Sequence, residues 1–136
     1  MSTETFNRAV SPLEGQRQEA HRLARQVYAQ GRAHQLQTWK VAKEAVAARL
    51  EKAKIAVNEL PVELPTDPKL LGEATAARQA ALNEFQAADA AMRAIEQQPS
   101  DRPLRADLDR VIGIIDTAHK GAMNELRVQH EIQPVL

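Results

Sequence analysis

Apolar residues recur at intervals of three and four along most of the chain, the period of a helix face buried against a partner. No stretch keeps the two-residue alternation of a strand for long. Three segments carry the clearest stripes: Leu36, Trp39, Val46, Leu50, Ala53, Val57 and Leu60; Ala74, Ala77, Ala81, Phe85, Ala88, Met92 and Ile95; and Leu104, Leu108, Val111, Ile115, Ala118 and Ala122. The pattern predicts an all-α protein whose helices meet along coiled-coil seams.

Proline-rich breaks separate the predicted helices. In "SPLE", Ser11 can cap a helix, Pro12 suits its first position, and Glu14 completes a capping box. The segment "PVELPTDP", residues 61–68, cannot lie inside a helix, because proline lacks the amide donor. Asp67 with Pro68 restarts a helix, and "PSDRP" separates it from a third that Ser100 or Asp101 caps. Helices are predicted at about 32–60, 68–98 and 102–131.

Gly31 falls where the first stripe changes phase. Upstream, a stripe of Leu13, Ala20, Leu23 and Val27 continues onto Gly31, whereas the downstream stripe needs Leu36 and Trp39. Residues 12–60 as one helix would span roughly 70 Å, against about 45 Å for each later helix. We therefore expect an antiparallel three-helix bundle or coiled coil of ~30-residue helices over residues 32–133. A flexible N-terminus over 1–10 and an amphipathic helical arm over 11–31 would precede it, with Gly31 as hinge and the arm straight or folded back. The alternative is a tolerated surface glycine, which costs roughly 1 kcal/mol.

The arm is the candidate partner-binding segment. Its apolar residues are Leu13, Leu23, Val27 and Tyr28, and its basic residues Arg22, Arg25 and Arg32 gather on the opposite side. An unpaired amphipathic helix usually binds a partner helix, a second copy of itself or a membrane surface. Four modest apolar residues argue against the membrane, and a solvated helix remains the alternative.

Composition narrows the function classes. Aromatic residues make up 3% of the chain and alanine occurs 24 times, which leaves little material for a thick core. Residues 1–60 carry ten basic and six acidic side chains, net +4, and residues 61–136 carry eight and twelve, net −4. Such a division favours head-to-tail self-association or a charged partner. The absence of cysteine, of a signal-peptide core and of a long apolar run predicts a cytoplasmic protein or part of a virion or assembly, with no membrane span.

Candidate chemistry is sparse. The "DTAH" segment gives Asp116 and His119 the i, i+3 spacing of half a helical di-iron site, but no second Glu-x-x-His pair occurs. The glycines form no phosphate-binding loop, and no nucleophile elbow or zinc motif is present. We therefore expect no catalytic residues, no metal and no cofactor, and hence a protein that is not an enzyme.

These patterns favour a non-enzymatic helical structural or adaptor subunit. It would self-associate as a homo-oligomer or join other protein chains in a larger assembly, such as a phage virion (as adaptor, connector or internal protein) or a secretion machine. The alternative is a small helical chaperone or regulator that clasps one partner protein. A third reading, nucleic-acid binding through the basic arm, requires salt-sensitive binding.

Overall fold

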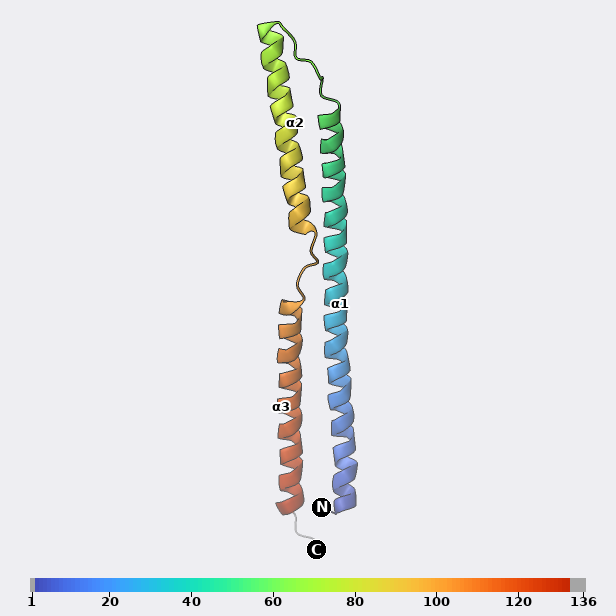
Figure 1. Ribbon diagram of the computed structural model, residues 1–136. Helices are drawn as coiled ribbons and strands as arrows, with labels where there is room; N and C mark the ends of the chain where they lie inside the picture. Colours follow the sequence, from blue (N-terminus) through green and yellow to red (C-terminus); the bar gives the residue numbers. More distant parts are fainter. Residues whose placement is uncertain (1, 133–136) are drawn as a thin grey trace. The chain divides into compact units, whose positions relative to one another are not determined.

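The computed structural model describes residues 2–132, and its first helix is far longer than the sequence pattern predicts. Helix α1 runs without a break over Thr3–Asn58 (Figure 1). Its start is set by Ser2, whose hydroxyl accepts the Thr5 amide at 3.1 Å and lies 2.7 Å from the Thr5 hydroxyl. Capping of this kind satisfies amides that a helix start leaves without partners. Pro61, three residues beyond Asn58, prevents α1 from continuing.

The structure therefore corrects the prediction of a separate N-terminal arm. Residues 11–31 form the interior of α1, and the segment expected to be flexible, 1–10, is helical from Thr3 onward. Ser11 and Glu14 do not cap a helix start, and Pro12 lies inside the helix. An interior proline costs about 3 kcal/mol, because it removes one backbone hydrogen bond and crowds the preceding turn. Contact with a second helix over this whole stretch offsets that cost.

Helix α2, Pro68–Ile95, begins where the sequence predicts. The Asp67 carboxylate accepts the Lys69 amide at 3.3 Å, and Pro68 occupies the first turn, where its missing amide costs nothing. At the other end of α2, the indole nitrogen of Trp39 donates to the Ile95 carbonyl at 2.8 Å, and Lys43 lies over the Trp39 ring. Trp39 thus satisfies one of the carbonyls that the helix end leaves open.

Helix α3 covers Arg102–Ile132 and runs antiparallel to the first part of α1. The Ser100 hydroxyl accepts the Arg102 amide at 3.2 Å, in agreement with the predicted cap. The direction follows from two contacts: the Phe6 ring lies 5.0 Å from the His130 ring, and the Tyr28 hydroxyl donates to Asp101. The N-terminal end of α1 thus contacts the C-terminal end of α3, as in an antiparallel helix pair.

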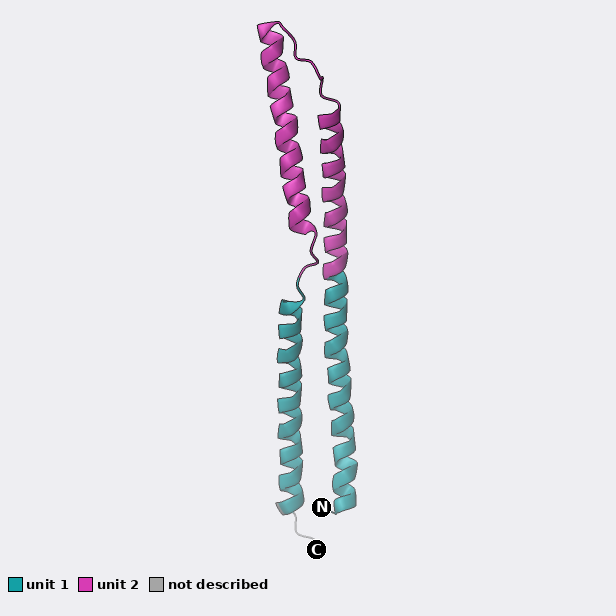
Figure 2. Cartoon of the chain, in the orientation of Figure 1, with its two compact units in different colours: residues 1–34, 100–136 teal, residues 35–99 magenta. Residues whose placement is uncertain are grey.

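The helices divide into two compact units (Figure 2). Unit 1 contains residues 1–34 and 100–136, so that the first part of α1 pairs with α3; unit 2 contains residues 35–99, so that the second part of α1 pairs with α2. The expected bundle instead assigned 32–60, 68–98 and 102–131 to one core, whose last residue, 133, lies outside the described residues. The structure differs because residues 3–34 offer α3 a seam of their own.

The seam of unit 2 agrees closely with the predicted heptads. Within the described residues, the only two classed as buried are Ala53, 3% exposed, and Ala88, 0% exposed, and both lie on predicted seams. Of the other predicted positions, Ala77 is exposed and lies off the seam, a correction to the predicted stripe. The following are half-buried: Val46, Leu50, Val57, Ala74, Ala81, Phe85, Met92 and Ile95. Alanine at the most buried places lets the two backbones approach closely. No helix among residues 2–132 is both long and apolar enough to cross a membrane.

Replacement of Pro12 by alanine tests the continuity of α1. Because residue 12 is a helix interior position, its new amide should bond the Arg8 carbonyl and stabilise unit 1 by up to about 3 kcal/mol. Hydrogen exchange should show slow exchange of that amide. Gly15→Ala, whose added Cβ meets nothing within 4 Å, is the control for a simple propensity gain of about 1 kcal/mol. Fast exchange at residue 12 would mean that a helix starts there after all.

Replacement of Ala88 by leucine tests the α1–α2 seam. A fully buried alanine leaves no room for the larger side chain, so unit 2 should lose about 1–3 kcal/mol of stability. Urea unfolding followed by the fluorescence of Trp39, the only tryptophan, gives the value. The exposed Ala77 on the same helix is the matched control, and Ala77→Leu should change stability by less than about 0.5 kcal/mol. Equal effects at both positions would contradict the seam.

Candidate interaction surface

One flank of the α1–α3 pair is built from charged and polar side chains that bridge the two helices. Arg17 donates from Nε to Asp116 Oδ1 at 2.9 Å, and His21 Nε2 lies 2.7 Å from the same oxygen. On the next turns, His119 Nε2 lies 3.0 Å from Glu14 Oε1. The two histidine side chains are only 16% and 15% exposed. We call Glu14, Arg17, His21, Asp116 and His119 the polar flank.

The polar flank fixes the protonation of its central carboxylate. The Arg17 guanidinium, through its hydrogen bond, holds the pKa of Asp116 below its ordinary value of 3.8; partial burial opposes this, and His21 adds to it. Asp116 therefore stays ionised and bonds two side chains of α1 at once. This arrangement fixes the register between α1 and α3.

A second polar bridge lies near the start of α3. The Tyr28 hydroxyl donates to Asp101 Oδ2 at 2.5 Å, and Arg105 Nε donates to the same oxygen at 2.8 Å. The Tyr28 hydrogen bond is the main cause that lowers the pKa of Asp101, with Arg105 and Arg32 acting in the same direction against desolvation. Tyr28 therefore belongs to the helix contact, with its hydroxyl tied to the segment that leads into α3.

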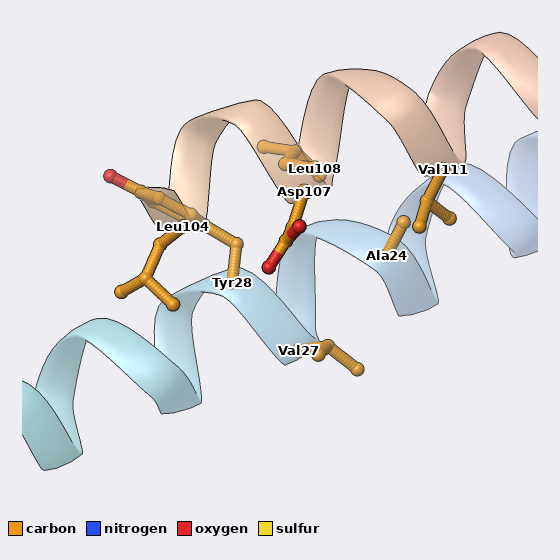
Figure 3. A pocket seen from close by; sticks show the side chains of 7 residues that line it. All are labelled: Ala24, Val27, Tyr28, Leu104, Asp107, Leu108 and Val111. Carbon is orange, nitrogen blue, oxygen red and sulfur yellow. The ribbon is translucent and has the colours of Figure 1, made fainter. Parts of the chain in front are cut away.

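The opposite flank of unit 1 is apolar and grooved. A groove of about 190 Å³ lies between the helices, with Ala24, Val27 and Tyr28 on α1 and Leu104, Asp107, Leu108 and Val111 on α3 (Figure 3). A second groove of about 250 Å³ is lined by Leu13, Gln16, Arg17, Ala20, Ile115, Ala118, His119 and Ala122, so it shares Arg17 and His119 with the polar flank. Apolar surface of this kind, left beside a helix seam, is typical of a place where another chain packs.

The predicted partner-binding residues fall into different environments. Leu23 and Val27 are 48% and 68% exposed, whereas Leu13 lines the second groove and Tyr28 the first. Arg22 pairs with Glu19 of its own helix, Nη2 to Oε1 at 2.6 Å. Arg25 is exposed, and Arg32 is half-buried near Asp101. Of the predicted stripe, Leu13, Ala20 and Gly31 are half-buried. Between Ala20 and Gly31 it is Ala24 and Tyr28 that are half-buried at the α3 contact, while Leu23 and Val27 are exposed beside it.

Gly31, expected as a hinge, lies in the interior of α1 under a side chain of α3. A Cβ added at Gly31 would come within 3.3 Å of Leu104 Cδ2 and 3.8 Å of Cδ1. The glycine thus gives Leu104 its place against the α1 backbone. By contrast, a Cβ added at Gly113 or Gly121 meets nothing within 4 Å, so those glycines hold no close helix contact.

The polar flank was missed by sequence reasoning, although a signal for it exists. Asp116 and His119 were noted for their spacing, and Glu14, Arg17 and His21 follow intervals of three and four, so that each set shares one helix face. What the sequence lacks is the register that brings the two faces together. Among the described residues, no group of three or more His, Cys, Asp or Glu side chains is arranged to hold a metal ion.

The charge division between the chain's halves has a local explanation. Counted over the helix bounds, α1 carries ten basic and five acidic side chains, whereas α2 and α3 are each balanced. The excess of acid lies in the two connections, at Glu59, Glu63, Asp67, Glu96 and Asp101. Some basic residues of α1 form ion pairs within the units: Arg49 Nε lies 2.6 Å from Glu84 Oε1, and Arg17 pairs with Asp116.

Comparison with known proteins does not extend this picture. No family model, no curated protein and no solved structure matches the chain. The role of unit 1 must therefore be inferred from its geometry alone. It has a polar flank whose groups bond one another, and an opposite side with an apolar groove and exposed side chains.

Replacement of Asp116 by asparagine tests the polar flank through pH. Because the pKa of Asp116 is lowered on folding, its contribution is complete above its ordinary value of 3.8 and is lost as pH falls through the lowered value. The wild-type protein should therefore be more stable than the variant at about pH 5, and the gap should close towards about pH 2. Urea unfolding at several pH values measures it. Asp109→Asn, at an exposed position of α3, is the control; a gap that does not depend on pH would refute the role of Asp116.

Proposed function

We propose that this protein is a non-enzymatic helical subunit that self-associates or joins other chains in a larger assembly. The observation that carries the proposal is the exposure of large apolar side chains along helices that have only one seam each. Val27 and Ile114 are 68% and 60% exposed, and Val41 and Ile55 are 55% and 48% exposed. A two-helix unit has no further layer of its own with which to cover such residues.

The chemistry of the polar side chains supports a structural role rather than catalysis. The histidines and carboxylates in contact, such as His21 with Asp116, bridge two helices and satisfy one another. Of the polar flank, Arg17 and His119 line the second groove, which is open to solvent rather than an enclosed pocket of the kind that usually holds catalytic groups. These contacts hold α1 and α3 in a fixed register. An assembly subunit needs a fixed register because its binding surface must be the same in every copy.

The composition suggests the kind of assembly. An alanine-rich, aromatic-poor, neutral chain of 136 residues suits a repeated component, such as an adaptor, connector or internal protein of a phage virion, or a part of a secretion machine.

A small chaperone or regulator that clasps one partner protein is the second candidate. The groove between Val27 and Val111 favours it, because about 190 Å³ beside exposed apolar residues can receive a side chain of a partner helix. The two candidates differ in stoichiometry, since a subunit forms oligomers of one kind and a chaperone binds one client.

Solution mass tests the proposal. Size-exclusion chromatography with light scattering should show a discrete oligomer of the 15.1 kDa chain, and the mass should be measured at low and moderate salt. An oligomer held by apolar surface should persist as salt rises, whereas one held by the charge division should loosen. A monomer at every salt and concentration would contradict self-association and favour the chaperone.

A further inference from the structure

The two flanks of the α1–α3 pair differ in how much apolar surface they expose. The groups of the polar flank are paired with one another across the helices. The other flank exposes Leu23 by 48%, Val27 by 68%, Val111 by 36% and Ile114 by 60%, beside the first groove. We call Leu23, Val27, Val111 and Ile114 the apolar flank. One side of the pair is therefore complete, and the other is suited to a further helical layer.

The register of the pair places the apolar residues of the two helices at the same level. His21 reaches Asp116 and Tyr28 reaches Asp101, so Leu23, between these two contacts, lies level with Val111. Ile114 lies within about one turn of that level, since a residue adds 1.5 Å along a helix. The apolar flank is thus a compact patch that draws equally on both helices.

We propose that this patch binds the same patch of a second copy of the chain, giving a four-helix contact whose two-fold axis is parallel to the helices. The inference rests on the proposed function and names the surface through which self-association occurs. Rotation about such an axis leaves the level of every residue unchanged. The α1 helix of one copy then lies along α3 of the other in the register it already has with its own α3, with Leu23 against Val111 and Ile114 of the second copy. All neighbouring helices are antiparallel, as in common four-helix bundles.

The polar residues at the edges of the patch favour this arrangement. On α1, Gln16 lines the second groove and Gln30 lies two turns beyond Leu23 on the same face, while Glu19, four residues before Leu23, is paired with Arg22 of its own helix. On α3, Asp107 lines the first groove and Glu125 lies two turns beyond Ala118, while Arg110 lines a hollow with Ile114 and Ala118. Gln30 and Asp107 lie at nearly the same level, so an amide donor of one copy faces a carboxylate of the other.

The alternative two-fold axis, across the helices, is disfavoured by charge. It would lay α3 antiparallel on α3, and with Ile114 at the centre it would bring Asp107 of one copy opposite Gly121 of the other, about one helical turn from Glu125. Like charges within about one turn of each other oppose association, which disfavours that arrangement. The neutral chain carries no net charge that would keep copies apart.

The chain has no cysteine, so single cysteines report contacts without background. A Leu23→Cys chain, lengthened by a tag, is refolded with an untagged Ile114→Cys chain and mildly oxidised. The expected product is a mixed disulfide dimer of the two chains, with little dimer from Ile114→Cys alone. A matched pair, Val41→Cys with Ile55→Cys, carries cysteines of similar exposure in unit 2 and should give no specific product. Circular dichroism and light scattering on each variant show that fold and mass are retained.

Each other outcome is decisive. Ile114→Cys homodimers in place of mixed dimers would overturn the axis and show α3 lying on α3. Disulfides at Val41 or Ile55, with none at Leu23 and Ile114, would overturn the patch while leaving self-association intact. No disulfide anywhere, with a monomeric mass for the unmodified protein, would reject self-association itself and with it that part of the proposed function.

Discussion

Each helix pair is held together by a single narrow seam of side chains. The rest of the structure depends on how little apolar surface such a seam can bury. In unit 2 the most buried places are alanines, Ala53 and Ala88, and larger residues such as Phe85 remain half-buried. In unit 1 no described residue is classed as buried. Because small seams contribute little burial free energy, each pair relies on specific polar contacts for its register and leaves large apolar residues outside.

The polar contacts act at particular points along α1. Trp39 joins α1 to the end of α2 through the Ile95 carbonyl, and Arg49 joins it to Glu84. Towards the N-terminus, Tyr28 binds Asp101, and Arg17 with His21 binds Asp116. These bonds lie across helix contacts, so each one fixes a level at which two helices meet. The exposed apolar residues are then held in constant positions, which a surface for assembly requires.

The sequence was sufficient for unit 2 and for the start of α3, because there the heptads, the prolines and the caps agree. The stripe from Val46 to Val57, the cap at Asp67 and the cap at Ser100 occur as expected, although α1 ends at Asn58 rather than at 60 and α2 at Ile95 rather than at 98. It failed in the first 31 residues, where two local signals competed. Ser11, Pro12 and Glu14 form a plausible helix start, yet Ser2 caps the actual one.

The phase error near Gly31 has a physical cause. Leucine and valine are more apolar than alanine and tyrosine, so the sequence pattern places Leu23 and Val27 on the stripe in preference to Ala24 and Tyr28. The structure reverses this choice because a tyrosine can pack its ring and still donate its hydroxyl to Asp101, which lies 73 positions away in the sequence. Local periodicity cannot contain that information. With the phase corrected, the seam passes through Gly31 without interruption, and the reason for a hinge disappears.

The central claim is that residues 3–34 of α1 pair with α3, and the contact beneath Leu104 tests it most directly. Nuclear Overhauser spectra of the isotope-labelled protein would show which protons lie near the Leu104 methyl groups. Because Leu104 Cδ2 lies 3.3 Å from the position that a Cβ would take at Gly31, we expect strong cross-peaks between those methyls and the Gly31 α protons. Cross-peaks from the Leu104 methyls to residues of 39–57, with none to Gly31, would contradict it and restore a three-helix bundle with a separate arm.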